Sequence, residues 1–559
     1  NGAVNNMELK TKWCSSLVKV FPAQEPESEP FNSGTALRGE IFSFQLAYNP
    51  VDFHRSEIGI EIESELRKFI SVRRVNLVPA EYTGANFDDD YISREPGLYP
   101  DVLSELKDNA VEAVYNQWRS LWFKVNVPKN CKPGKYKINV KLSADFPNTE
   151  EKPIRKNVSF TLEVLDAQLP VQKLINTHWF HTDCLAVYYN VDVFSEEYWR
   201  IVGNFMKNAA EHGINLILTP VFTPPLDTKP GTERPTVQLV DVILKKGKYS
   251  FGFKKLDRWI ALAKKCGVKY FEISHLFSQW GAGFAPKIVA EVDGREKRIF
   301  GWDVKSDSKE YTEFLDAFLP VFTAYLKKNK LQDKVYFHCS DEPVLEHLES
   351  YGKAVAIMHK HLKGFKIMDA LSNVDFYKKG LVSIPVPSET HLEEFIAAGM
   401  KERWTYYCCG PTVTYSNRFI HMPSSRNRIM GTQMYYYGVE GFLHWGFNFY
   451  FSQLSRYPVD PYKCTDSGLA FPAGDPFIVY PGKNGMPEDS IRHEVFTEGL
   501  QDQRALQLLE TKMPREKIMK ELDKLSPDSK MSMANYPRGE KNVLAVRKKI
   551  NQLIKKHFA

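Results

Sequence analysis

The chain has 559 residues, a length that predicts two or three domains. Its 74 basic and 68 acidic residues give a net charge of only +6, and no dense Lys/Arg block precedes the C-terminal tail. This balance argues against nucleic acid or a membrane surface as the partner, and no apolar run approaches the roughly 20 residues that a membrane span needs.

The eight cysteines are scattered and form no CxxC pair, which favours a reducing compartment. The opening residues NGAVNNMELK lack the basic and apolar pattern of a signal peptide. The sequence therefore predicts a cytoplasmic protein, or a secreted or periplasmic one if a signal peptide has been removed.

Residues 1–168 read as an all-β region. Apolar and polar residues alternate with period two in several runs, which are separated by Pro/Gly turns such as Lys132-Pro133-Gly134. The clearest of these runs are 41–48, 121–127, 136–142 and 158–164. Strands at this spacing predict an N-terminal β-sandwich that ends near Asp166 to Pro170.

From Leu174 the pattern changes to strands that alternate with helices. Eight strand candidates follow, at 174–177, 215–219, 270–274, 335–339, 366–368, 381–384, 403–407 and 441–445. This alternation predicts a (β/α)8 TIM-type barrel over residues 169–485, and residues 486–559 are predicted to form a C-terminal helical extension packed on the barrel. The predicted fold class is thus multidomain α/β. Two long connections, 277–302 and 447–485, are predicted to be functional loops.

The most informative stretch is VYFHCSDEP, from Val335 to Pro343. It places two adjacent carboxylates, Asp341 and Glu342, at the carboxyl end of a predicted strand, where barrel enzymes hold their catalytic groups. The same four residues Ser-Asp-Glu-Pro also make an ordinary helix start, with Pro343 as the first helical residue. Both readings agree on a tight strand-to-helix turn.

Polar and aromatic residues near the other strand ends, and in the two long connections, form a predicted substrate-binding set. Its members are His178, Asp183, His275, Trp280, Trp302, Asn373, Trp404, Tyr406, Trp445, Asn448 and Asp475. Aromatic rings match the apolar faces of sugars, and convergent polar groups match their hydroxyls, so the set favours carbohydrate. Each aromatic residue could instead fill the barrel core.

Other chemistries lack their motifs. The sequence contains no HExxH metal pair, no GxSxG nucleophile elbow, no Walker A loop and no complete GxGxxG. No metal or cofactor is expected. Two neighbouring carboxylates suit a glycosidase mechanism in which the 2-acetamido oxygen of the substrate attacks the anomeric carbon, while one carboxylate holds the acetamido N–H and the other serves as acid and base.

Several segments together resemble the family 123 glycoside hydrolases, the β-N-acetylgalactosaminidases. They are Ser340-Asp341-Glu342-Pro343, Ala285-Pro286 with Phe300-Gly301-Trp302, Gly441-Phe442-Leu443-His444-Trp445-Gly446, Gly474-Asp475-Pro476-Phe477 with Tyr480-Pro481-Gly482, and Ser490-Ile491-Arg492 with Glu498-Gly499-Leu500. With the N-terminal sandwich they span nearly the whole chain.

The resemblance implies an exo-acting enzyme that releases β-linked N-acetylgalactosamine (GalNAc) from glycan ends with retention, by the substrate-assisted route. It implies that Asp341 orients the acetamido group and that Glu342 is the acid/base. Two alternatives remain open. One is a β-N-acetylglucosaminidase or broader hexosaminidase, whose substrate differs only at O4. The other is a non-catalytic glycan-binding protein. The sequence does not indicate an oligomeric state.

Overall fold

The computed structural model describes residues 7–53, 56–147 and 149–558, which fall into two compact units. Unit 1 comprises Asn1–Lys173, Thr412–Tyr437 and Glu488–Ala559, and unit 2 comprises Leu174–Pro411 and Gly438–Pro487. The sequence-based division into 1–168, 169–485 and 486–559 is contiguous, whereas the structure groups distant segments. In particular, 412–437 and 488–559 belong with the N-terminal segment.

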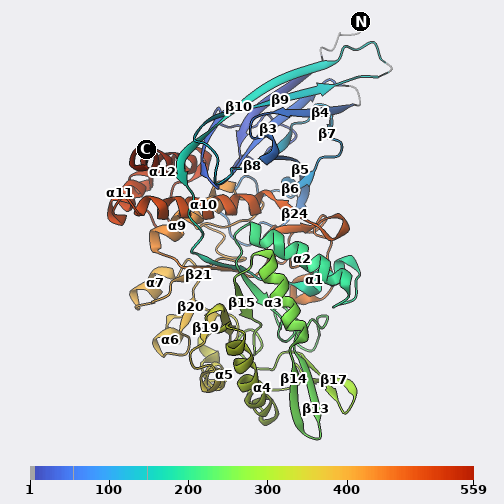
Figure 1. The fold of residues 1–559 in the computed structure, drawn as a ribbon, viewed down its shortest axis with the longest axis vertical. Coiled ribbons are helices and arrows are strands. Elements are labelled where there is room, and N and C mark those ends of the chain that lie inside the picture. Colours follow the sequence, from blue (N-terminus) through green and yellow to red (C-terminus); the bar gives the residue numbers. More distant parts are fainter. Residues whose placement is uncertain (1–6, 54–55, 148, 559) are drawn as a thin grey trace. The chain divides into compact units, whose positions relative to one another are not determined.

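Unit 1 is rich in β-structure (Figure 1). One sheet contains, in spatial order, β1 (Glu8–Ser15), β3 (Ile41–Val51), β8 (Arg119–Asn126), β5 (Ile70–Ala80), β6 (Gly97–Glu105) and β24 (Pro487–Ser490). A second sheet has the order β2 (Ser33–Arg38), β10 (Ile154–Gln168), β9 (Gly134–Ala144), β4 (Glu57–Glu63) and β7 (Ala110–Glu112).

The two sheets of unit 1 share one hydrophobic core. The ring of Phe44 on β3 stacks on that of Phe160 on β10 with centroids 3.9 Å apart, and it also stacks on Phe123 of β8 at 5.1 Å. These residues lie on the inward face that the period-two alternation predicts. The four clearest predicted strands correspond to β3, β8, β9 and β10.

The helices of unit 1 come from its two later segments. They are α8 (Ser424–Arg428), α9 (Met430–Tyr437), α10 (Ile491–Glu510), α11 (Arg515–Leu525) and α12 (Gly539–Phe558). α9 and α10 approach each other closely at two glycines. A Cβ placed on Gly431 would lie 1.7 Å from the carbonyl oxygen of Gly499. Only glycine allows backbones to pack at that distance.

A buried network of ion pairs joins the three segments of unit 1. Arg428 donates to Asp502 (Nε to Oδ2, 2.8 Å), and Arg547 on α12 donates to the same carboxylate (2.7 Å). Arg547 also pairs with Glu40 at 2.7 Å, and Arg428 pairs with Glu498 at 3.1 Å. Each charge is compensated, which burial requires.

Unit 2 is built on a parallel sheet that forms a nearly closed eight-stranded barrel. Its order is β20 (Ile384–Val386), β19 (Lys366–Ala370), β18 (Val335–His338), β15 (Tyr270–Ile273), β12 (Leu216–Thr219), β11 (Ile175–His178), β22 (Gly441–His444) and β21 (Trp404–Tyr406). The edges meet where Tyr406 donates its N–H to Pro387 (3.1 Å) and Glu389 donates to Tyr406 (3.0 Å).

All eight predicted barrel strands occur, in chain order around the barrel. The sixth begins at Ile384 and not at Leu381, because the chain is still turning after Gly380, whose φ is +70°. The helices of unit 2 are α1 (Thr182–Tyr189), α2 (Glu196–Glu211), α3 (Lys254–Cys266), α4 (Lys309–Lys328), α5 (Leu348–His361), α6 (Val374–Lys378) and α7 (Leu392–Ala397).

Sequence features set these helix boundaries. The hydroxyls of Ser195 and Ser308 accept the N–H groups of Tyr198 and Tyr311, and so cap α2 and α4. Gly267, with φ +101°, ends α3. The apolar stripe of each of these three helices is buried, as their 3.6-residue periodicity predicts.

The first long connection is partly ordered as strands. β16 (Ile288–Val292) and β17 (Arg295–Phe300) join β13 (Asp241–Lys245) and β14 (Lys248–Gly252) in a sheet of order β14-β13-β16-β17 (Figure 1). The second connection contains β23 (Val479–Pro481). Short 3-10 turns occur at Arg67–Phe69, Gln332–Lys334, Leu345–His347, Gln453–Ser455, Lys483–Gly485 and Pro527–Ser529. Within the described residues, no helix combines the length and apolarity needed to span a membrane.

Candidate active site

The turn that follows β18 is fixed by the loops on both sides of it. Asp369 on β19 accepts the N–H of Ser340 (3.0 Å), and the Ser340 hydroxyl donates to the carbonyl of Ser278 (2.7 Å). The N–H of Trp280 donates to the carbonyl of Asp341, and the N–H of Glu342 donates to that of Ala370, each at 2.9 Å. The two neighbouring carboxylates therefore lie on a tightly held backbone.

The prediction that Pro343 opens a helix is wrong. α5 begins at Leu348, after the 3-10 turn Leu345–His347. Glu342 has a φ of +44°, in the left-handed region, so the chain reverses there and does not enter a helix at the next residue.

Different partners hold the two carboxyl groups. Asp341 is only 6 % exposed, and its Oδ2 accepts from Nε2 of Gln279 at 2.7 Å. Glu342 is half-buried, and its Oε1 accepts from the hydroxyl of Tyr406 at 2.8 Å. Gln279 follows β15 and Tyr406 ends β21, so the pair is clamped from opposite sides of the barrel mouth.

Both carboxyl groups line a cavity of about 90 Å³. The other residues around it are Trp179, Leu226, Asp227, Gln279, Trp280, Ala370, Tyr406, Cys408, Cys409, Leu443, Trp445 and Phe471. A wider cavity of about 660 Å³ shares Trp280, Glu342 and Tyr406 with it, and is further lined by Asn373. Glu342 therefore faces an opening large enough for a saccharide, and Asp341 lies in the smaller cavity beside it.

Burial dominates the electrostatics of the site. It raises the pKa of Asp341 well above the ordinary value, and the neighbouring charge of Glu342 raises it further. Burial also raises the pKa of Asp227, across the cavity, to about 6. A proton is therefore retained in this site to a higher pH than on an exposed carboxyl group.

A buried charged group lies beneath the turn. His338 contacts Glu272 (Nε2 to Oε1, 2.7 Å) and Asp369 (Nδ1 to Oδ1, 3.3 Å) inside the barrel. Burial lowers the pKa of His338, but the two carboxylates outweigh it and raise the pKa to about 10. Asp369 also accepts from the hydroxyl of Tyr351 at 2.7 Å. This network orients Asp369, which accepts the backbone N–H of Ser340.

Five members of the predicted substrate-binding set lie at or directly behind these cavities. Trp280, Tyr406 and Trp445 line the cavity around Asp341, and Asn373 lines the wider one. Asp475 accepts from the indole N–H of Trp445 at 3.0 Å, so it orients that ring from behind. Trp280 is 44 % exposed, which leaves its ring open to solvent.

Five other members of the set lie elsewhere in unit 2, with their side chains in buried contacts. Asp183 pairs with Arg234 at 2.6 Å, and the amide of Asn448 bonds the backbone of His181. The indole of Trp404 donates to Glu402 at 3.0 Å. The two histidines are also buried. His275 packs on Trp179 and His338, and His178 packs on Phe442 and His444.

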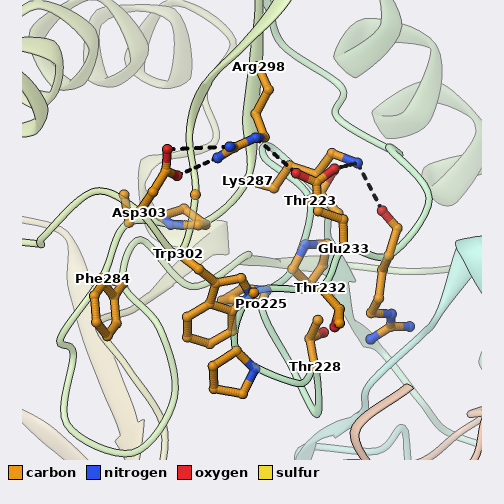
Figure 2. A pocket seen from close by; sticks show the side chains of 17 residues that line it. Thr223, Pro225, Thr228, Thr232, Glu233, Phe284, Lys287, Arg298, Trp302 and Asp303 are labelled. Carbon is orange, nitrogen blue, oxygen red and sulfur yellow. Dashed lines mark hydrogen bonds and ion pairs between the residues drawn. The ribbon is translucent and has the colours of Figure 1, made fainter. Parts of the chain in front are cut away.

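Trp302, the remaining member, lines a separate cavity of about 330 Å³ (Figure 2). Several residues that shape the main site carry no recognisable signal in the sequence, namely Gln279, Cys408, Cys409 and Phe471. Gln279 sits in a long loop whose register against Asp341 cannot be read from spacing. Within the described part of unit 2, no three His, Cys, Asp or Glu side chains lie close enough to share a metal ion.

A pair of carboxyl groups over an aromatic-lined cavity, at the carboxyl end of a parallel barrel, is typical of glycoside hydrolases. The family model described as "Glycoside hydrolase 123, catalytic domain" matches residues 179–509, which is more than half of the chain. The chain belongs to glycoside hydrolase family 123.

Comparison with solved structures supports the fold. A family 123 glycoside hydrolase from Clostridium perfringens, reported for glycolipid glycan hydrolysis, is 15 % identical with a TM-score of 0.71, covering 98 % of this chain and 97 % of its own. A family 5 mannosidase from Rhizomucor miehei is 13 % identical with a TM-score of 0.31, covering 59 % of this chain and 94 % of its own. A family 10 xylanase from Thermobacillus composti is 12 % identical with a TM-score of 0.28, covering 54 % of this chain and 93 % of its own. Both structures are too dissimilar to bear on the fold or function of this chain. No curated protein sequence matches the chain significantly.

Proposed function

We propose that the protein is an exo-acting, retaining β-N-acetylgalactosaminidase that releases terminal β-linked GalNAc from glycans or glycosphingolipid-type oligosaccharides. The observation that carries the proposal is the adjacent pair Asp341 and Glu342, held apart by Gln279 and Tyr406 over one cavity. Membership of family 123 supports a glycosidase, and the C. perfringens enzyme of similar fold acts on glycolipid glycans.

The proposed reaction needs no nucleophile from the protein. The acetamido oxygen of the bound sugar attacks the anomeric carbon as the glycosidic C–O bond breaks, and Glu342 donates its proton to the leaving oxygen. The carboxylate of Asp341 accepts the acetamido N–H and stabilises the positive charge of the cyclic oxazoline intermediate. Glu342 then takes a proton from water, which opens the intermediate with retention.

The raised pKa of Asp341 is compatible with this division of roles. In the ligand-free site the raised pKa of Asp341 favours keeping a proton on that residue. An acetamido N–H aimed at Asp341 favours its anionic form, because a hydrogen bond donated to a carboxylate stabilises the charge. Substrate binding thereby lowers the pKa of Asp341 and favours release of its proton, which leaves the carboxylate that the oxazoline intermediate needs.

The aromatic walls serve as the proposed sugar contacts. Trp445 and Trp280 offer rings to the apolar face of the pyranose, and Asp475 fixes the orientation of Trp445. Tyr406 keeps Glu342 directed into the cavity. Asn373 in the wider cavity can accept or donate to sugar hydroxyls.

The test uses an aryl β-N-acetylgalactosaminide with a good leaving group and a natural glycan. Glu342→Gln should lower glycan cleavage by at least about 100-fold, since the acid is lost, and should spare part of the aryl activity. Asp341→Asn should impair both, because the intermediate loses its stabilising carboxylate. An aryl N-acetylglucosaminide assayed in parallel distinguishes a hexosaminidase from the proposed enzyme.

A substrate analogue provides the sharpest control. An aryl glycoside with a hydroxyl in place of the acetamido group has no internal nucleophile, so it should not be turned over. Efficient hydrolysis of that analogue by the wild-type enzyme would contradict the substrate-assisted mechanism. Binding of glycans without any product after long incubation would instead favour a non-catalytic protein.

A further inference from the structure

We propose that Cys408 and Cys409, at the mouth of the barrel, form a binding site for a soft divalent cation, with Zn²⁺ the best fit, and that an ion bound there blocks the cavity of Asp341 and Glu342. The site itself goes beyond the proposed function, since binding of the ion needs neither substrate nor turnover. Only the effect of the ion on turnover rests on the proposed function.

The two thiols lie side by side although their residues are adjacent in the chain. They follow β21 at its carboxyl end, and their Sγ atoms are 3.8 Å apart. The N–H of Cys408 donates to the carbonyl of Gly410 at 2.9 Å, so the chain turns at this point. Successive side chains of an extended strand point to opposite faces, whereas both of these cysteines line the same cavity.

The separation of the two sulfur atoms matches that of two ligands on one tetrahedral ion. Zn–S bonds are about 2.3 Å long, and two such bonds at the tetrahedral angle place their sulfur atoms about 3.8 Å apart. A disulfide fits less well, because its S–S bond is about 2.05 Å and its Cα atoms are usually about 4.4–6.8 Å apart, whereas adjacent residues are held at about 3.8 Å. A bridging ion therefore needs less rearrangement than oxidation of the pair.

The surroundings of the pair favour a cation. The described residues that line the cavity include three carboxyl groups, those of Asp227, Asp341 and Glu342, and no lysine, arginine or histidine. Glu342 and Asp475 also interact electrostatically with the thiol of Cys408. Thiolates are soft ligands, so they select Zn²⁺ over Mg²⁺ or Ca²⁺.

An ion can reach both thiols and can leave again. Cys409 is exposed and Cys408 is half-buried. Binding forms two S–metal bonds and releases the two thiol protons to water, because the thiolate is the metal ligand. Within the described part of unit 2 no third His, Cys, Asp or Glu lies close enough to share the ion, so water fills the remaining positions. With two protein ligands the ion is exchangeable, unlike that of a closed four-ligand site.

A bound ion would exclude the sugar. Both thiols line the cavity of about 90 Å³ that also holds Asp341 and Glu342. Each water on the ion brings about 30 Å³ of its own, so a hydrated ion takes up a large part of this space. The ion and the terminal sugar therefore compete, and the availability of the cation regulates the enzyme.

A titration of the reduced full chain with Cd²⁺ tests the site without any substrate. Cd²⁺ bound to thiolates gives an ultraviolet charge-transfer band, which should saturate and should be reversed by excess Zn²⁺. Cys409→Ser and Cys408→Ser should each weaken binding by at least about 100-fold, since loss of a residue that only orients a ligand already costs about 10–100-fold. Cys266→Ser, which removes a half-buried thiol of α3, is the matched control and should change nothing.

Two outcomes of this titration would overturn the site. They are equal Cd²⁺ affinities of the wild-type protein and Cys409→Ser, and a band that excess Zn²⁺ leaves in place. Circular dichroism checks the fold of each variant. If Cys408→Ser fails to fold, Cys409→Ser decides the question, because Cys409 is exposed.

Kinetics on the aryl β-N-acetylgalactosaminide test where the ion lies. Zn²⁺ should raise KM and leave kcat unchanged, and a chelator should restore the original KM. In Cys409→Ser the same Zn²⁺ concentration should change KM by less than about twofold, relative to the KM of that variant without metal. A fall in kcat at constant KM would overturn the placement of the ion in the sugar cavity. If the protein releases no GalNAc at all, the Cd²⁺ titration still decides whether the site exists.

Discussion

At the scale of single residues, the dominant feature is the cost of ionising Asp341 in its buried position. Its pKa is raised by burial and by the adjacent Glu342, whereas in the unfolded chain it ionises at the ordinary value. The native state therefore binds more protons than the unfolded state once the pH passes that ordinary value. Stability contributed by the neutral carboxyl is present at low pH and is lost as the pH rises through the raised pKa.

The first prediction concerns this residue. Asp341→Asn keeps the shape and removes the charge, so it should raise the melting temperature at pH 7.5 and change it little at pH 4. Thermal unfolding followed by circular dichroism at both pH values measures the difference. Glu342→Gln removes the neighbouring charge that adds to this cost, so it should raise the melting temperature at pH 7.5 in the same direction. A lower melting temperature of Asp341→Asn at pH 7.5 would contradict the burial argument.

The sequence identifies Asp341 and Glu342 because adjacency and strand-end position are local properties. It does not identify Gln279 or the role of Tyr406, since their contacts depend on how three separate loops meet. Trp404 is the opposite case, a residue that the sequence places in the substrate-binding set although the structure buries it away from the cavities. Trp404 and Tyr406 lie two residues apart and point to the same face of β21, so only their depth along the strand places Trp404 against Glu402 while Tyr406 reaches Glu342.

At the scale of elements, periodicity predicts all eight barrel strands and their alternation with helices, because burial of one face enforces the pattern. It fails at Pro343, where tertiary hydrogen bonds to the 340–342 turn outweigh the local preference of Ser-Asp-Glu-Pro for a helix start. The close approach of α9 and α10 also has no local signal except two glycines, one on each helix.

Glycine substitutions test the close packing of α9 against α10. Gly431→Ala places a methyl group against the backbone of α10, which cannot move aside like a side chain, so unfolding should become easier by at least about 2 kcal/mol. Gly352→Ala in α5 has no atom within 4 Å of the new methyl group and should stabilise by about 0.5–1 kcal/mol. Urea unfolding of both variants measures the contrast. Equal effects at the two sites would contradict the packing.

At the scale of the whole molecule, the chain crosses between the two units four times, after residues 173, 411, 437 and 487. The sequence indicates the first and last of these changes through shifts in pattern near 168 and 485. It does not indicate that 412–437 and 488–559 complete the N-terminal unit. Pairs such as Glu40 with Arg547 join residues from opposite ends of the chain, and no local pattern records them.

The buried network predicts how unit 1 responds to charge removal. Arg547→Leu leaves Glu40 without its ion pair and deprives Asp502 of one of two partners, so the variant should lose about 3–5 kcal/mol of stability. Lys555→Leu on the same helix removes an exposed pair with Glu163 and should cost less than about 1 kcal/mol. The shift in urea midpoint measures both. A similar small cost for Arg547→Leu would show that the network is not essential.

The left-handed conformation of Glu342 limits which residues can occupy position 342 without strain. At a φ of +44° a branched or bulky residue is strained, and glycine or asparagine is the residue that folding alone would select. The proposed catalytic role of Glu342 accounts for a glutamate at a position where glycine or asparagine would be less strained. In a gene copy released from catalysis, position 342 should be among the first of the site to change, and its replacement by glycine would leave a more stable protein that still binds the glycan.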